Sequence, residues 1–198
     1  MKIGLLGGTF DPIHRAHVEL ANSAIKEAGL DELYFIPAYV SPFKLNVETE
    51  EGDDRYKMIE KILHYNPAFR VSDYELSNEG TSYTFNTLEH FDSLLDGDIY
   101  FIVGSDSLLQ LDTWYRGKEI LSKYHIISSR RPGSWSATAE RKVEEYIKLY
   151  NARIQILVMP PIDISASEIR QRIVEGKDIK DFVLPEVEEY IIEHNLYR

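Results

Sequence analysis

The 198-residue sequence contains no cysteine, which excludes disulfides and thiolate metal sites. It also has no apolar run approaching the roughly 20 residues of a membrane-spanning helix. The first apolar stretch, residues 3–6, is cut short by Gly7 and Gly8, too early for the core of a signal peptide. We therefore expect a cytoplasmic protein with no membrane partner.

Basic residues are scarce too, with 22 Lys and Arg against 33 Asp and Glu and a formal net charge of −11. This balance disfavours nonspecific binding to nucleic acid or to an anionic membrane surface, since both require a basic patch. The acidic balance does not exclude binding of a small anionic ligand, because a few local cations can hold one. A hydrophobic content of 43% with 12% aromatic residues is enough for a packed core.

Short apolar runs alternate with amphipathic segments along the chain. The runs typical of buried strands are residues 2–6, 33–36, 69–72, 99–103, 124–128 and 155–158. Helical spacing marks residues 18–28, 55–65, 83–95, 138–149 and 187–194. The alternation predicts an α/β fold, a Rossmann-like doubly wound and mostly parallel sheet with helices on both faces. Ligands of such sheets bind beyond the carboxyl ends of the strands.

Two polar stretches, residues 37–54 and 129–137, are predicted to be surface loops. Either could close over a ligand.

The segment after the first predicted strand has the features of a phosphate-binding loop. Gly7 and Gly8 allow a sharp turn and a close approach of the backbone to an anion. Asp11 and Pro12 predict a helix start, with the aspartate as the cap and the proline in the first helical position. A helix N-terminus at this place favours phosphate.

His14 and His17 lie three residues apart just after this loop. On one face of a helix they could both donate to phosphoryl oxygens. Taken alone, each could equally be a surface residue, or the two could form a metal-binding pair.

A second anion site is predicted at residues 164–170. Ser165 and Glu168 have the spacing of a capping box, which would explain both residues without a ligand. Arg170, in the next turn, has no part in that cap.

The middle of the chain offers groups for a nucleoside. Asp106 follows the predicted strand 99–103 and could accept hydrogen bonds from ribose hydroxyls. Trp114 offers a flat face to an aromatic ring. A helix-capping aspartate and a half-buried core tryptophan are the alternatives.

Residues 7–17 resemble the GGTFDPxHxGH signature of the nucleotidylyltransferase superfamily with the (H/T)xGH motif. Ala16 stands at the second glycine of that signature. Residues 164–170 are similar to the superfamily's ISSTxIR motif, with Ala166 for its second serine and Ser167 for its threonine.

Further segments resemble the bacterial nicotinate-nucleotide adenylyltransferases in the same order along the chain. They are residues 37–44 (PxxxxPHK, with Phe43 at the histidine), Glu75 with residues 82–88 (E…SYTxxTL), 104–114 (GADxxxxxxxW), 131–133 (RPG) and 187–197 (VxxYIxxxxLY).

This resemblance implies transfer of AMP from ATP to nicotinate mononucleotide, with Mg²⁺ held mainly by the phosphates and no metal ligand from protein side chains. It assigns catalysis to His14, His17, Lys44 and Arg170. It assigns ATP binding to Gly7, Gly8, Thr9, Phe10, His14, His17, Gly104, Asp106, Ile164, Ser165, Ser167 and Arg170. It assigns nicotinate mononucleotide binding to Lys44, Tyr83, Thr84, Trp114 and Arg131.

Two alternatives stay open at this point. The same reaction on nicotinamide mononucleotide is one, and a non-catalytic nucleotide-sensing module is the other, favoured only by Ala16, Phe43 and Ala166. We expect residues 1–198 to form a single nucleotidyltransferase domain, with a helical part at about 164–198 packed on it. The sequence leaves open whether the protein forms a homo-oligomer.

Overall fold

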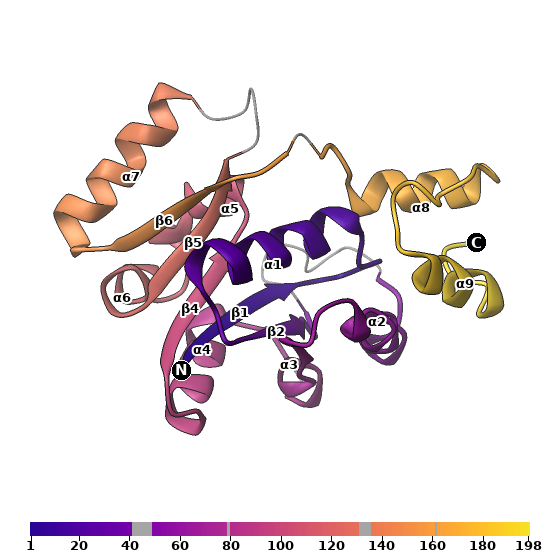
Figure 1. The fold of residues 1–198 in the computed structure, drawn as a ribbon, viewed down its shortest axis with the longest axis horizontal. Helices are drawn as coiled ribbons and strands as arrows, with labels where there is room; N and C mark the ends of the chain where they lie inside the picture. The colour runs from indigo at the N-terminus through magenta and orange to yellow at the C-terminus, as the bar shows by residue number, and fades with distance from the viewer. Residues whose placement is uncertain (41–48, 79, 131–135, 161) are drawn as a thin grey trace.

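The computed structural model of the chain describes residues 1–40, 49–78, 80–130, 136–160 and 162–198. Its strands are β1 (Lys2–Gly8), β2 (Glu32–Pro37), β3 (Phe69–Val71), β4 (Asp98–Val103), β5 (His125–Arg130) and β6 (Arg153–Val158). They form one parallel sheet in the order β3-β2-β1-β4-β5-β6 (Figure 1). Every run predicted to be a strand overlaps one of these, so the strand predictions are confirmed.

The helices follow the strands along the chain. They are α1 (Arg15–Ala28), α2 (Gly52–Glu60), α3 (Tyr74–Ser77), α4 (Thr84–Leu94), α5 (Ser105–Leu108), α6 (Gly117–Lys123), α7 (Ala137–Tyr150), α8 (Ala166–Val174) and α9 (Pro185–Glu193). Two 3₁₀ turns, η1 (Leu63–Tyr65) and η2 (Leu111–Thr113), complete the described elements. The predicted helices at 18–28, 83–95, 138–149 and 187–194 are confirmed within a few residues.

The prediction of one helix over residues 55–65 is wrong at both ends. α2 begins at Gly52, inside the stretch predicted to be a loop, and ends at Glu60, after which η1 follows. Asp53 and Asp54 lie in the first turn of α2, where acidic side chains interact favourably with the helix dipole. These two acidic residues of the predicted loop are therefore part of a helix start.

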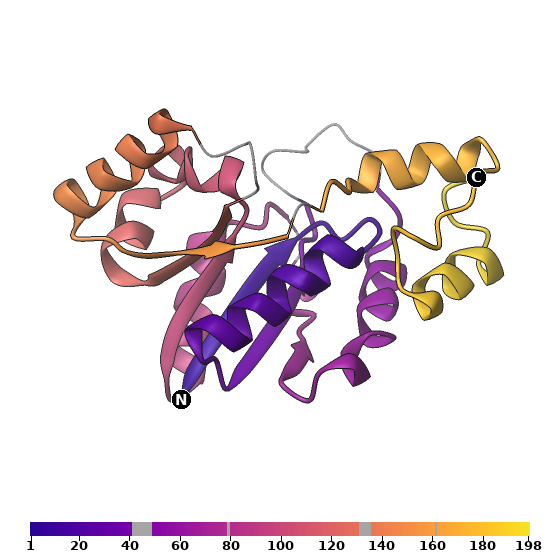
Figure 2. The same cartoon turned by 45° about the horizontal axis from the view of Figure 1, so that its top comes forward.

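Helices cover both faces of the sheet (Figures 1 and 2), as a doubly wound fold requires. Because side chains alternate along a strand, neighbours on β1 enter different cores. Leu6 packs with residues of α1, α2, α8 and α9, whereas Leu5 packs with residues of α4, α6 and α7. The predicted Rossmann-like fold class is confirmed.

The strand order reverses between β1 and β4. The chain runs outward from β1 through β2 to β3, then returns beside β1 and runs outward again from β4 to β6. In both views α7 and the α8–α9 pair lie at opposite ends of the molecule (Figures 1 and 2), so the chain after β6 returns past the carboxyl ends of the strands. In the described part of the chain, no helix is both long and apolar enough to span a membrane.

Gly117, the first residue of α6, provides a test of this packing. A Cβ atom at this position would stand 1.8 Å from the carbonyl oxygen of Leu111 in η2. We expect Gly117→Ala to lower the free energy of unfolding by about 1–3 kcal/mol, because the backbone must shift to accept the methyl group. Denaturant unfolding measures this, and Ser122→Ala on the exposed side of α6 is the control, expected within about 0.5 kcal/mol of wild type. Equal stabilities of the two variants would contradict this picture of the η2–α6 contact.

Candidate active site

A cavity of about 500 Å³ opens at the carboxyl ends of β1 and β4, where the strand order reverses. Its volume lies in the range of small-molecule sites, about 300–1,000 Å³. The predicted site residues that line it are Gly7, Gly8, Thr9, Phe10, His14, His17, Thr84, Gly104, Trp114, Ile164, Ser165 and Ser167. The structure thus brings together residues from the first and the eighth helix around one cavity.

The other predicted site residues fall into two groups. Tyr83, Asp106 and Arg170 are described but do not line this cavity. Lys44 and Arg131 lie outside the described residues, as does Phe43.

The loop after β1 is fixed by the ring of Phe10. Phe10 has a φ of 50°, a left-handed conformation that is unfavourable for a residue with a side chain. Its buried ring packs edge-on against Phe35 and His17, with centroids 5.9 and 5.0 Å away, which offsets this cost. A Cβ atom on Gly8 would approach the same ring to 3.0 Å, so a glycine at this position gives the ring its room.

The predicted helix start at Asp11 and Pro12 is wrong. α1 begins at Arg15, and its N-cap residue is His14. Asp11 is only 2% exposed, and its carboxylate accepts hydrogen bonds from the Tyr197 hydroxyl at 2.9 Å and the Glu50 amide at 3.3 Å. The aspartate therefore serves long-range contacts instead of capping the helix.

The two histidines lie against one another at the N-terminus of α1. Their rings stack with centroids 3.6 Å apart and an interplanar angle of 17°. The backbone N–H of His14 donates to Nδ1 of His17 at 3.3 Å. Because Nδ1 accepts, the neutral His17 ring carries its proton on Nε2, which can donate to an anion. The predicted proximity of the two histidines is confirmed.

Arg55 holds the loop that follows β1 in place through its buried guanidinium. Its guanidinium is 2% exposed and donates through Nη1 to the carbonyl oxygens of Thr9 and Ala38, both at 2.8 Å. Its Nε donates to the carbonyl of Glu50 at 3.0 Å. Burial lowers the pKa of Arg55, but an arginine starts so high that it stays charged. No local pattern in the sequence signals that this arginine would be buried.

α8 presents a second helix N-terminus to the cavity. The Ser165 hydroxyl accepts from the backbone N–H of Glu168 at 3.2 Å, so the predicted cap is present. Arg170 lies one turn further and donates through Nη1 to the main-chain oxygen of Asp11 at 2.7 Å. Its Nη1 also lies 3.6 Å from the Asp11 carboxylate, and its Nη2 lies 3.4 Å from the Ser167 hydroxyl.

Trp114 and Thr84 form the wall opposite the histidines. Trp114 is half-buried and meets the ring of Phe101 at 6.2 Å in an edge-on arrangement. Thr84 is the first residue of α4, where backbone N–H groups have no partner within the helix.

Glu75 and Ser82 line the same wall, although no site role was predicted for them. Glu75 is 8% exposed and accepts a hydrogen bond from the Thr87 hydroxyl at 2.5 Å. Burial raises the pKa of its carboxyl group. The sequence signal was available, since both residues lie in the segment that resembled E…SYTxxTL.

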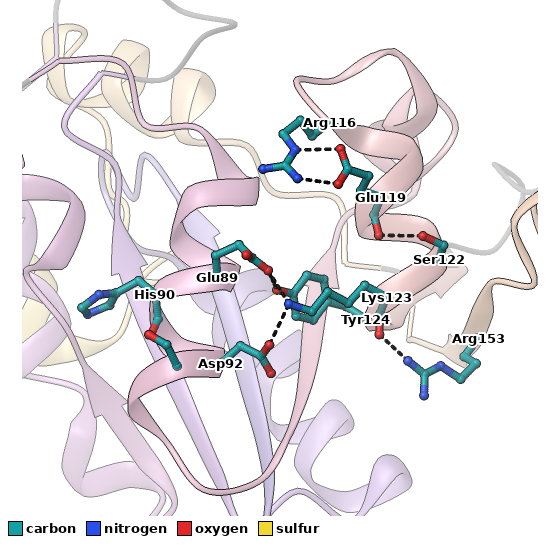
Figure 3. A network of polar contacts seen from close by, with 10 residues as sticks. Glu89, His90, Asp92, Arg116, Glu119, Ser122, Lys123, Tyr124 and Arg153 are labelled. Carbon is teal, nitrogen blue, oxygen red and sulfur yellow. Dashed lines mark hydrogen bonds and ion pairs between the residues drawn. The ribbon is translucent and has the colours of Figure 1, made fainter.

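A network of polar contacts joins α4 to α6 beside this wall (Figure 3). Lys123 pairs with Asp92 at 2.9 Å and also with Glu89. The guanidinium of Arg116 lies 3.6 Å above the ring of Phe85, the neighbour of Thr84 in the chain. The network thus connects the helix that begins at Thr84 with the segment that follows Trp114.

The Trp114 segment is also joined to α7. Asp112 accepts from the Tyr146 hydroxyl at 2.6 Å and from Lys142 at 2.9 Å. Tyr146 is fully buried, so this contact fixes the segment to the core.

The described residues contain no group of three or more His, Asp or Glu side chains placed to hold a metal ion.

Comparison with known proteins identifies the family. A model of the cytidylyltransferase-like family matches residues 5–172. Proteins named probable nicotinate-nucleotide adenylyltransferases, from Caldicellulosiruptor saccharolyticus and Carboxydothermus hydrogenoformans, are each 40% identical to the whole chain, which covers 100% and 98% of them. The chain belongs to the nicotinate-nucleotide adenylyltransferase family.

Solved structures agree with the fold. The nicotinic acid mononucleotide adenylyltransferase of Plasmodium falciparum, complexed with APC, superposes with a TM-score of 0.81 at 22% identity, over 99% of this chain and 96% of that one. The same protein complexed with NaAD gives a TM-score of 0.78 at 23% identity, over 99% and 97%.

The raised pKa of Glu75 predicts how stability depends on pH. The folded state binds this proton more tightly than the unfolded state, whose value is near 4.5. The stability from Glu75 is therefore full below that value and is lost as the pH rises through the folded pKa. We expect the unfolding free energy of Glu75→Gln, relative to wild type, to increase from pH 4 to pH 7, measured by urea unfolding.

Glu89→Gln is the control with the opposite sign. Hydrogen bonding to Lys123 lowers the pKa of Glu89, so its stability is present at high pH and is lost as the pH falls. The relative stability of that variant should decrease over the same range. If the stability of each variant relative to wild type did not change with pH, the pKa shifts assigned to Glu75 and Glu89 would both be contradicted.

Proposed function

We propose that this protein transfers AMP from ATP to nicotinate mononucleotide, giving deamido-NAD and pyrophosphate, in NAD biosynthesis. The observation that carries this proposal is one cavity that joins the stacked histidines of α1 to Trp114 and Thr84. The first side suits phosphates, and the second suits an aromatic ring with an acidic group. Relatives at up to 40% identity over the whole chain are named for this activity.

The reaction needs no protein nucleophile. An oxygen of the mononucleotide's 5′-phosphate forms a bond to the α-phosphorus of ATP, and the bond from that phosphorus to pyrophosphate breaks. A phosphate monoester is already anionic near neutral pH, so a general base adds little. The protein contributes by placing both substrates and by stabilising the charge that develops on the phosphates.

We assign the triphosphate to the side formed by α1 and α8. His14 and His17 donate to oxygens of the α- and β-phosphates, with Nε2 of His17 as one donor. Lys44 and Arg170 steady the triphosphate and the leaving pyrophosphate. The backbone at residues 7–10 and at 164–167, together with Gly104 and Asp106, completes the ATP site.

We assign the mononucleotide to the other wall. Trp114 stacks on the pyridine ring, and the backbone N–H of Thr84 binds its carboxylate. We also assign Tyr83, Lys44 and Arg131 to the mononucleotide. The N-terminus of α4 favours an anion at this point. Burial raises the pKa of the Glu75 carboxyl on the same wall.

Mg²⁺ fits this site as a companion of ATP. The described residues provide no ready-made cage of carboxylates, and Mg²⁺ commonly binds through substrate phosphates and water. Bound in this way, it would supply positive charge to the phosphates.

We further propose that residues 1–198 act as one nucleotidyltransferase domain. α9 packs against α2, and its residues Val187, Tyr190 and Ile191 join the core that contains Leu6 of β1. A cytoplasmic location, the absence of nucleic-acid and membrane partners, and the oligomeric state stay predictions.

Removal of the His17 ring tests the phosphate side. Loss of one donor to charge that develops in the transition state costs roughly 2–4 kcal/mol, so we expect His17→Ala to lower kcat by about 100- to 1,000-fold. His64→Ala is the matched control, because its ring is exposed on η1, and it should keep the wild-type rate. A near-wild-type rate for His17→Ala at saturating ATP would rule out the assignment.

The choice between the acid and the amide is tested by measuring kcat/KM for nicotinate and nicotinamide mononucleotide side by side. We expect the acid to be preferred by at least about tenfold, because donors at a helix N-terminus pair with a carboxylate better than with an amide. Pyrophosphate release is the readout. Equal values would contradict the assignment of the Thr84 wall, and no release with either substrate would favour a sensing module.

A further inference from the structure

The segment that follows α9 turns back onto the nucleotide-side loop. Asn195 and Tyr197 have φ values of 54° and 62°, both in the left-handed region. Such conformations cost about 1 kcal/mol or more for residues with side chains and persist where surrounding contacts impose them. Leu196, between them, is 6% exposed and belongs to the core.

The contacts that impose this turn come from the active site. The backbone N–H of Tyr197 donates to the Glu50 carboxylate at 2.8 Å, and its hydroxyl donates to Oδ1 of Asp11 at 2.9 Å. Asp11 belongs to the loop between β1 and α1, 186 residues earlier in the chain. This loop carries the ring of Phe10 and ends at His14.

Asp11 in turn holds Arg170. Its main-chain oxygen accepts from Nη1 of that residue at 2.7 Å, and its Oδ2 lies 3.6 Å away from the same nitrogen. The Asp11 side chain thus accepts on Oδ1 from the Tyr197 hydroxyl and the Glu50 backbone amide, while its Oδ2 faces the Arg170 guanidinium at ion-pair distance.

We propose that Tyr197 is a positioning residue of the ATP site, acting through Asp11 on both the loop before α1 and the guanidinium of Arg170. This inference rests on the proposed function, which places the triphosphate between these two elements. Tyr197 does not line the cavity, so its effect is indirect. Burial, followed by the nearby charge of Asp11, raises the pKa of Tyr197 and keeps its hydroxyl protonated as a donor.

The expected effect of Tyr197→Phe follows from the chemistry. Without this hydroxyl, the buried carboxylate keeps the longer hydrogen bond from the Glu50 amide, at 3.3 Å, and depends more on its ion pair with Arg170. The carboxylate then draws the guanidinium away from the triphosphate. We expect kcat/KM for ATP to fall by about 5- to 30-fold, less than the roughly 10- to 150-fold of a direct hydrogen bond to a charged group, because the effect is indirect. KM for nicotinate mononucleotide should stay within about twofold.

The chain offers a matched control in Tyr190→Phe. The Tyr190 hydroxyl also donates to an aspartate, Asp54, at 2.7 Å, but this contact joins α9 to α2 outside the cavity lining. Loss of a hydroxyl with a purely structural role lowers the unfolding free energy and leaves the kinetics unchanged. We expect both variants to lose similar stability in urea unfolding, and only Tyr197→Phe to lose kcat/KM for ATP.

Asp11→Ala checks that the effect passes through the carboxylate. In that background Tyr197→Phe should change ATP affinity by less than about twofold, because the acceptor is already gone. A kinetic profile of Tyr197→Phe equal to that of Tyr190→Phe would overturn the proposal. A similar loss for both substrates would also overturn it, since it would show a general weakening of the fold.

ATP affinity measured by calorimetry with Mg²⁺ separates this proposal from the proposed function. If wild type binds ATP but does not use nicotinate mononucleotide, the proposed function fails, and weaker ATP binding by Tyr197→Phe alone still supports the positioning role. If wild type turns over and Tyr197→Phe binds ATP with unchanged affinity and rate, the positioning role fails and the function stands. Failure of wild type to bind ATP at all overturns both.

Discussion

The geometry of the nucleotide side depends on one buried carboxylate. A charged group that is 2% exposed must be matched by donors, because an unpaired buried charge costs several kcal/mol. Asp11 meets this requirement with two hydrogen-bond donors, the backbone amide of Glu50 and the hydroxyl of Tyr197, and with an ion pair to the guanidinium of Arg170. Arg55 fastens the same loop through the Thr9 carbonyl. Formation of the phosphate-side loop is thereby coupled to docking of α2, α8 and the segment after α9.

The opposite wall is held by different means. The ion pairs of Lys123 lie on side chains about 35–45% exposed, and pairs in such surroundings typically contribute about 0–1 kcal/mol. The wall therefore depends more on packing, with Phe85 and Tyr146 buried in the same core as Phe101. The two walls to which we assign the substrates thus have supports of different character, a buried polar junction and an apolar core. The residues behind the two walls also belong to different core clusters, with Phe10 in one and Phe85 in the other.

The sequence predicted what local pattern determines. The six strands were found because each is a short apolar run, and the predicted helix end at residue 28 agrees with α1, which Gly29 caps in the left-handed conformation. The start of α1 was missed because local capping rules assign Asp11 to the helix, whereas its partners lie up to 186 residues away. Arg170 was expected at phosphate, yet its contact with Asp11 could not be read from spacing. Long-range pairing leaves no local periodicity.

In the proposed function, a chain with a net charge of −11 binds a triphosphate through local cations, and among these Arg170 is held in place by the fold. The Arg170 guanidinium is anchored by a short bond to a carbonyl, at 2.7 Å, which is independent of ATP's charge. Its contacts with the Asp11 carboxylate, at 3.6 Å, and with Ser167, at 3.4 Å, are longer than the 2.7–2.9 Å of a charge-assisted hydrogen bond. These long contacts are the ones that phosphate oxygens can replace at low cost. An acidic residue beside an anion site is therefore consistent with binding, because it keeps the cation in place until the phosphate arrives.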